Sequence, residues 1–216
     1  TTSYCDETGG DFYDVVLPEG PGKNTVQLVL GDVSGHGVSS ALLMATARAL
    51  FRQRSAMGGT LDCIVGDVNR QLCQDVRDSG DFMTMIVVEI NAAQNVLKWV
   101  RAGQDPAVLY DASAGRFTNL KGPGIALGLD ETFQYTENIL SGLPKGVVLA
   151  LFSDGIWEAK NVSGAAFGKE NLKQMIRQNA QASANEIRDR VMAALTQFQG
   201  SAKRQDDASL VIIKKK

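Results

Sequence analysis

The sequence has one histidine, three cysteines and no long apolar run, and each shortage excludes a class of protein. With His36 as the single histidine, a zinc site built from several histidines cannot form. The three cysteines, Cys5, Cys63 and Cys73, are odd in number and lack metal-type spacing, which argues against a disulfide framework or zinc knuckle and favours a reducing, cytoplasmic setting. No stretch approaches the roughly 18 apolar residues of a membrane span, so no membrane contact by this domain is predicted.

An excess of charge of one sign is also missing. The chain has 22 Lys and Arg against 24 Asp and Glu, a net charge of −2, so it lacks the basic stripe typical of proteins that bind nucleic acid. Its 216 residues, 44% of them hydrophobic, suit a single globular domain over 1–216. Because Thr1 stands almost directly before the first aspartate motif, we expect a longer protein with an N-terminal sensor or regulatory domain.

Common hydrolytic and nucleotide-binding motifs are absent as well. A Ser-His-Asp triad would have to use His36, and the nearest serine, Ser34, lies on a glycine-rich turn without a nucleophile-elbow pattern. Cys73 is followed by Arg77, which is the wrong spacing for a cysteine phosphatase loop. Neither the Walker phosphate loop nor the dinucleotide fingerprint occurs.

What the sequence does contain is a set of aspartates beside glycines or at turns. Strand-like runs lead into Asp32 and Asp154, and another leaves Asp207, so neighbouring strands would bring these acids to one sheet edge. Oxygen-only ligands suit Mg²⁺, Mn²⁺ or Ca²⁺, and without EF-hand spacing a catalytic Mg²⁺ or Mn²⁺ is favoured. For any one acid, the alternative is a turn aspartate that bonds its own backbone. The candidate acids are Asp11, Asp32, Asp154, Asp206 and Asp207.

The periodicity of the chain predicts strands and helices in one α+β domain. Apolar residues recur at helical spacing from Val38 to Arg54 and after Thr60, a candidate N-cap, and Ser183 opens a late helix with a capping box that ends on Glu186. Residues 90–96 are typical of a hairpin, and 18–22 of a loop. Helices packed outside a sheet or pair of sheets are expected. Strands are predicted at 26–30, 84–90, 96–100, 107–110, 147–152 and 210–213.

Five motifs, in this order, resemble those of the bacterial metal-dependent Ser/Thr protein phosphatases of the type 2C (PPM) superfamily. The sporulation-E-like branch, whose members regulate sigma factors, is the most similar. The resemblance covers essentially the whole chain. The motifs are Gly9-Gly10-Asp11-Phe12-Tyr13-Asp14, Gly31-Asp32-Val33-Ser34-Gly35-His36-Gly37, Ala102-Gly103-Gln104-Asp105-Pro106, Phe152-Ser153-Asp154-Gly155-Ile156 and Asp206-Asp207-Ala208-Ser209-Leu210-Val211.

The resemblance implies a four-layer αββα sandwich of two mainly antiparallel sheets flanked by helices, with two Mn²⁺ or Mg²⁺ ions at one end. It implies that these ions activate water to hydrolyse phosphoserine or phosphothreonine on a regulatory protein, such as an anti-sigma-factor antagonist. By the same resemblance, Asp32 bridges the ions, Asp11 and the carbonyl of Val33 serve one, and Asp154 and Asp206 serve the other. Asp207 is an alternative ligand or a supporting residue.

Some features leave alternatives open. The family commonly has Ala-Gly-His-Asn-Pro where this chain has Gln104 and Asp105, so a substrate contact by that histidine does not carry over. Asp14 is a candidate for supporting Asp11, and His36 for a general acid that protonates the leaving serine oxygen. The helix from Val38 is a candidate for regulation, because it follows Asp32 directly. The rival functions are a catalytically silent interaction module and a two-metal phosphodiesterase.

Overall fold

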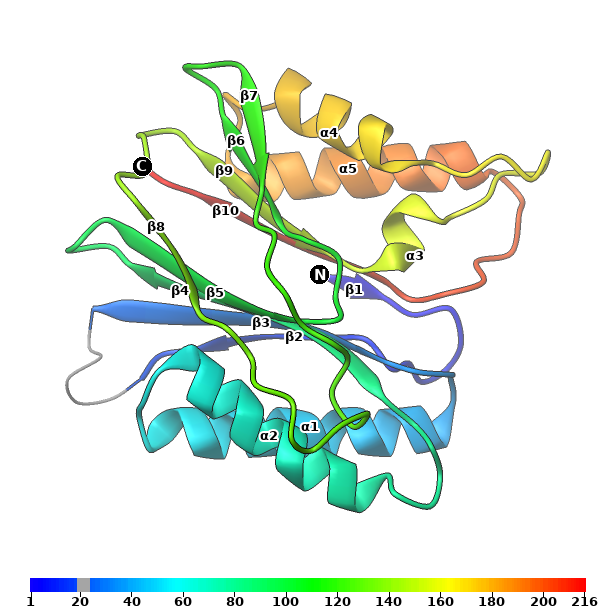
Figure 1. Ribbon diagram of the computed structural model, residues 1–216. Coiled ribbons are helices and arrows are strands. Elements are labelled where there is room, and N and C mark those ends of the chain that lie inside the picture. The colour runs from blue at the N-terminus through cyan, green and yellow to red at the C-terminus, as the bar shows by residue number, and fades with distance from the viewer. Residues whose placement is uncertain (19–23) are drawn as a thin grey trace. The chain divides into compact units, whose positions relative to one another are not determined.

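The computed structural model describes residues 1–18 and 24–216 (Figure 1). Residues 19–22 of the loop expected at 18–22 therefore lie outside the described part. The chain divides into two compact units, each with one sheet. Unit 1 comprises Thr1–Cys5, Ala107–Leu120 and Pro144–Lys216, and unit 2 comprises Asp6–Pro106 and Lys121–Leu143.

Unit 2 is an antiparallel sheet covered on one face by two helices, α1 (Val38–Ala56) and α2 (Leu61–Asp75), as Figure 1 shows. Every second residue of the central strands points toward these helices: Val29, Val87 and Val100 share a buried core with Phe51 of α1 and Ile64 of α2. The strand order is β2 (Phe12–Val16), β3 (Thr25–Val33), β4 (Met83–Asn91), β5 (Val96–Ala102) and β8 (Asn138–Ser141).

Unit 1 repeats this plan with a second antiparallel sheet. Its core joins alternate residues of β9, such as Ala150, to Ile176 of α4 (Lys169–Gln178) and Leu195 of α5 (Ala184–Gln199). A one-turn helix, α3 (Asp154–Trp157), follows β9 directly. The strand order is β1 (Thr2–Ser3), β10 (Ala208–Lys214), β9 (Val148–Phe152), β6 (Val108–Asp111) and β7 (Arg116–Asn119).

The fold class and the predicted elements are confirmed. All six expected strands are present, the 90–96 hairpin joins β4 to β5 with Asn91 opposite Val96, and the capping box of α5 forms between Ser183 and Glu186. Thr60 is the N-cap residue of α2, but its side chain makes no capping hydrogen bond; the carboxylate of Glu137 accepts from the Leu61 amide instead, at 3.0 Å. Of the helices in the described ranges, not one combines the length and apolar character that a membrane crossing requires.

Asp14 ties β2 to α1. It lies on the helix-facing side of β2, with its side chain 8% exposed, and accepts hydrogen bonds from Arg52 Nε at 2.5 Å and Arg52 Nη2 at 2.8 Å. Arg48 Nε lies 3.0 Å from the same carboxylate. The structure thus gives Asp14 a set of contacts on α1 that the sequence did not predict. Burial alone would raise the pKa of Asp14. The hydrogen bond from Arg52 and the charges of Arg48 and Arg52 together lower the pKa by more, so the net shift is downward.

Replacing Asp14 by asparagine should lower the free energy of unfolding by about 1–3 kcal/mol at pH 7, because charge-assisted hydrogen bonds are lost. A depressed carboxyl pKa stabilises the folded state fully above the unfolded pKa of about 3.9, and this contribution disappears as the pH falls through the folded pKa. The difference between the wild type and Asp14→Asn should therefore shrink below about pH 4. Urea denaturation of both proteins at pH 7 and pH 3.5 measures this difference in unfolding free energy.

The matched control is Asp189→Asn, which breaks an exposed pair with Arg188. It should change the unfolding free energy by less than about 1 kcal/mol at either pH. Equal effects of the two substitutions at pH 7 would contradict the role given to Asp14.

Candidate metal centre

In unit 2 the strand register places Asp11 opposite Asp32. Phe12 pairs with Gly31, and the amide of Val33 donates to the carbonyl of Gly10 at 3.4 Å, so the residues between these pairs face each other. Phe12 and Val33 belong to the core beneath the helices, and the two aspartates therefore project from the opposite face of the sheet. Directly opposed residues on one face have Cβ atoms about 4.5–5.5 Å apart.

This pairing fits a bound cation. Two like charges directly opposite each other on a sheet are destabilising unless something neutralises them. Asp11 is only 1% exposed, so water screens its charge poorly. The two carboxylates would supply the oxygen ligands that hard divalent cations prefer, and a cation held between them would offset their repulsion.

Glycines keep the surroundings of these acids open. A Cβ on Gly10 would lie 2.9 Å from the carbonyl oxygen of Val33, so any larger residue would press on the oxygen that the sequence resemblance assigns to the metal. A Cβ on Gly31 would lie 2.6 Å from side-chain atoms of both Phe12 and Met83. Glycine at these positions lets the strand end that carries Asp32 pack closely.

In unit 1 the pairing of β9 with β10 brings the remaining acids together. Phe152 lies opposite Leu210, and beyond this pair Ser153 bridges the two chain segments. Its Oγ accepts from the Ser209 amide at 2.9 Å and donates to the Asp207 carbonyl at 3.2 Å. Asp154 follows as the first residue of α3 and thus stands beside the 206–207 turn.

The two adjacent acids of that turn differ in environment. Asp207 is 3% exposed, and its Oδ1 accepts from the Cys5 amide at 2.9 Å, so this carboxylate holds the N-terminal segment against β10. Asp206 is exposed, and its Oδ1 accepts from the Asp207 amide at 2.8 Å. The sequence offered no means of ranking these neighbours, whereas burial and hydrogen bonding separate them.

Each unit holds part of the expected ligand set. Unit 2 contains Asp11 and Asp32 with the carbonyl of Val33, and unit 1 contains Asp154, Asp206 and Asp207. Within residues 1–18 and 24–216, no group of three or more His, Cys, Asp or Glu side chains is arranged so that it could hold a metal ion. The oxygen donors of the candidate set match Mg²⁺ and Mn²⁺ in chemistry, and the opposed pair in unit 2 matches them in placement.

Two contacts near these acids were not predicted. Thr84 lies opposite Asp32 on β4, and its hydroxyl donates a hydrogen bond to the side-chain carbonyl of Gln104, which is 3% exposed. Gln104 thus lies close to the Asp32 strand end although the family histidine is missing. His36 is exposed, with Nδ1 3.7 Å from the Asp6 carboxylate. Its role as a general acid stays a prediction.

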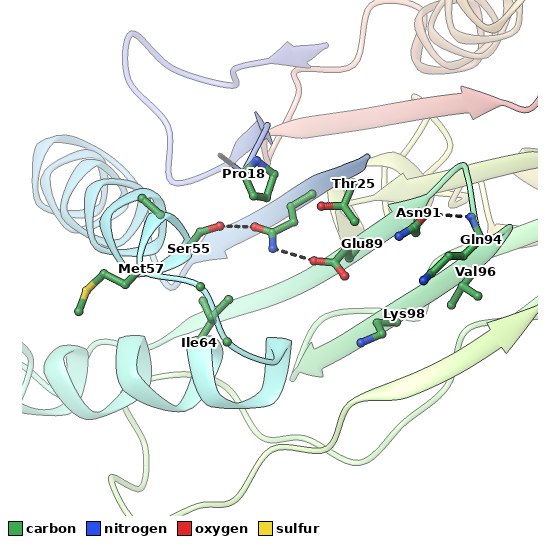
Figure 2. Close-up of a pocket in the computed structure, with 14 residues that line it drawn as sticks. Pro18, Thr25, Ser55, Met57, Ile64, Glu89, Asn91, Gln94, Val96 and Lys98 are labelled. Carbon is green, nitrogen blue, oxygen red and sulfur yellow. Dashed lines mark hydrogen bonds between the residues drawn. The ribbon is translucent and has the colours of Figure 1, made fainter. Parts of the chain in front are cut away.

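A pocket of about 520 Å³ in unit 2 is separate from these acids (Figure 2). It is lined by Thr25 and Gln27, at the opposite end of β3 from Asp32, and seven residues of strand separate Thr25 from Asp32 by roughly 24 Å. The side-chain amide of Gln27 accepts a hydrogen bond from the Ser55 hydroxyl and donates one to the Glu89 carboxylate. These polar side chains of the pocket bond to one another, and no candidate acid lines it, so the pocket is not part of the candidate metal centre.

The chain has the fold of the type 2C protein phosphatases. It aligns over its full length with a structure described as the SiaA-PP2C domain of Pseudomonas aeruginosa, at a TM-score of 0.86 and 23% identity, and covers 85% of that chain. A structure of RsbX in complex with magnesium aligns with 98% of this chain and 91% of its own, at a TM-score of 0.70 and 14% identity. At such identities these matches establish the fold alone.

Within that class, the chain belongs to the family described as Stage II sporulation protein E (SpoIIE), whose model matches residues 22–216. The branch recognised in the sequence is thereby confirmed. Among curated proteins, the phosphoserine phosphatase RsbU of Bacillus subtilis is 25% identical over 210 residues, which are 97% of this chain. The chain spans 60% of the length of RsbU.

Proposed function

We propose that this chain is a Mn²⁺- or Mg²⁺-dependent phosphatase that hydrolyses phosphoserine or phosphothreonine on a protein. The observation that carries the proposal is the register that sets Asp11 opposite Asp32 on one face of the unit 2 sheet. Two carboxylates on one face of a sheet supply oxygen ligands of the kind that Mg²⁺ and Mn²⁺ prefer. Membership of the SpoIIE family and similarity to a phosphoserine phosphatase support the same reaction.

The proposed ligands come from both units, which together would form one phosphatase domain over 1–216. Asp32 would be a ligand of both ions, Asp11 and the Val33 carbonyl would hold one of them, and Asp154 and Asp206 would hold the other. Similarity to a magnesium-bound structure supports the choice of metal. Asp207 is assigned a supporting role, because its buried carboxylate is bound to the Cys5 amide. When bound, two such ions would lower the pKa of a water and neutralise the phosphoryl oxygens.

The chain's own groups would hold this site in place. Asp32 lies within β3, and Asp11 directly precedes β2, whose first residue, Phe12, is paired with Gly31, so both backbones are fixed before any ion arrives. The lack of a side chain at Gly10 leaves space beside the Val33 carbonyl oxygen. In unit 1, the hydrogen bonds of Ser153 fix the start of α3 against the 206–207 turn. Such rigidity lowers the free-energy cost of assembling the ligands.

The proposed substrate is a regulatory phosphoprotein, with an anti-sigma-factor antagonist as the specific candidate implied by the sequence resemblance. The name of RsbU, a phosphoserine phosphatase, supports a phosphoserine substrate. We further propose a cytoplasmic location and an N-terminal sensor or regulatory domain in the full protein.

Removal of divalent metal should abolish the reaction reversibly. Treatment with EDTA is expected to reduce hydrolysis of a phosphoserine peptide by at least about a hundredfold, because loss of the metals removes several kcal/mol of transition-state stabilisation. Adding Mn²⁺ back should restore it, and release of phosphate is the measurement. A catalytically silent interaction module would show no phosphate release in either state. A phosphodiesterase would prefer a cyclic dinucleotide over the phosphopeptide, so both substrates should be compared.

A further inference from the structure

Arg101 lies on the same face of the unit 2 sheet as the opposed aspartates. It is paired with Ile86 on β4, whereas Asp32 is paired with Thr84, two residues earlier on the same strand. Val87 and Val100 point into the core beneath the helices, so Ile86 and Arg101 point to the other face, as Thr84 and Asp32 do.

The separation is suited to a group held between the two residues. Two strand spacings of about 4.8 Å and a two-residue rise of about 6.8 Å place the Cα atoms of Arg101 and Asp32 roughly 12 Å apart. Side chains on one face of a sheet stand roughly perpendicular to it, so this spacing leaves room for a tetrahedral anion between the guanidinium of Arg101 and a metal held by Asp32. The strand register therefore places the positively charged guanidinium of Arg101 across from the proposed metal site at Asp32.

Arg101 has no anionic partner within the described part of the chain. The residue is half-buried, and its Nε is fully buried without a hydrogen bond. The other arginines on or between the helices of this unit are paired: Arg48 and Arg52 with Asp14, and Arg54 and Arg70 with Asp67. A partly buried guanidinium without an anion carries a desolvation cost that a bound anion would offset.

The backbone at Arg101 is fixed by close packing. A Cβ on Gly124 would lie 1.7 Å from the Arg101 carbonyl oxygen, so the segment around Gly124 runs directly against this strand. Two residues on, Gly103 adopts a positive φ of 77°, and a Cβ there would lie 2.9 Å from the amide nitrogen of Ala126. The strand end that carries Arg101 is thus held between contacts that tolerate only glycine.

We propose that Arg101 binds the phosphate group of the substrate. The planar guanidinium presents parallel N–H donors that match two oxygens of a phosphate, and its charge does not depend on pH. This inference rests on the proposed function, because it takes the metals at Asp32 as the other side of the phosphate site. Arg101 is a substrate-binding residue that the acid motifs do not reveal.

The test compares the wild type with Arg101→Gln, Arg101→Lys and, as a control, Arg70→Gln. Arg70 is an exposed arginine on α2, on the opposite side of the sheet from Arg101. Its replacement changes the net charge by the same amount as the replacement of Arg101 by glutamine. Inorganic phosphate is titrated into Mn²⁺-loaded protein by calorimetry, and KM and kcat are measured with a phosphoserine peptide. Binding of Mn²⁺ alone is titrated separately.

Arg101→Gln should weaken phosphate binding and raise KM by about 10- to 100-fold, as expected for loss of hydrogen bonds to a charged group. Arg101→Lys keeps the charge but loses the paired N–H donors of the guanidinium, so its KM should rise less. For Arg70→Gln, KM and phosphate affinity should stay within about twofold of the wild type. Affinity for Mn²⁺ should not change in any variant. If Arg101→Gln does not fold, Arg101→Lys decides, since it keeps both charge and stem.

Phosphate affinity and KM that match the wild type in folded Arg101 variants would overturn this inference while leaving the phosphatase proposal intact. A wild type that releases no phosphate with any divalent metal would instead overturn the proposed function. In that case, phosphate binding that still depends on Arg101 would support an anion site on this face, and binding that does not would reject it.

Discussion

Replacing Asp32 by asparagine should reduce kcat/KM for a phosphoserine peptide by at least about a thousandfold. Asp32 is proposed as a ligand of both ions, so its loss should weaken the binding of each. A thousandfold loss corresponds to about 4 kcal/mol of transition-state stabilisation. The fold should survive, because the backbone pairing of Asp32 with Thr84 does not involve the carboxylate. Phosphate release and thermal unfolding of the same preparation measure the two effects.

The control for this substitution is Asp111→Asn. Asp111 is a turn aspartate in the strict sense, since its Oδ1 accepts hydrogen bonds from the Ser113 and Ala114 amides. It represents the alternative role that the sequence allows for each acid, and its replacement should leave turnover within about twofold. Metal-dependent hydrolysis that persists in Asp32→Asn would show that Asp32 is not an essential metal ligand.

Replacing Gly155 by alanine should produce the largest loss of stability among single substitutions near the acids. A Cβ at this position would lie 2.0 Å from the Asp207 carbonyl oxygen, which is backbone and cannot rotate away. Overpacking of this kind costs about 3 kcal/mol or more, and for a chain of this length it corresponds to a fall in Tm of about 6–12 °C. Because the clash displaces the 206–207 turn, affinity for Mn²⁺ should fall as well.

Thermal unfolding with and without Mn²⁺ measures this effect, and Gly66→Ala is the matched control. Gly66 lies inside α2, and its nearest neighbour to a new Cβ is the tip of Arg70 at 3.8 Å. Alanine there should raise stability by up to about 1 kcal/mol, because glycine disfavours a helix interior. An unchanged Tm for Gly155→Ala would mean that α3 and the turn are not packed as described.

The elements with clear local signals could be predicted from sequence. The capping box at Ser183 and the apolar spacing of α1, α2 and α5 depend on nearby residues, and each forms as expected. Strand β2 was missed because Asp14 interrupts its apolar alternation, and only the two arginines of α1 make that buried aspartate tolerable. The capping bond predicted for Thr60 at the start of α2 was wrong for a similar reason, because the carboxylate that accepts from the Leu61 amide belongs to Glu137, far away in the sequence.

The candidate acids could be proposed from sequence because each stands beside a glycine or next to an apolar run. Their roles depend on register and burial, which local patterns do not encode. That Asp11 faces Asp32, that Asp207 is occupied by the Cys5 amide, and that Arg101 shares the face of Asp32 all follow from which strands pair and in which register. A shift of one residue in β5 would turn Arg101 to the opposite face.

The most direct measurement is a crystal structure of the protein soaked in Mn²⁺, with the ions located by their anomalous scattering. The account predicts two ions: one bound by Asp11, Asp32 and the Val33 carbonyl, and a second bound by Asp32, Asp154 and Asp206. Manganese found only at unrelated surface carboxylates, with Asp11 and Asp32 bound to no ion, would contradict it.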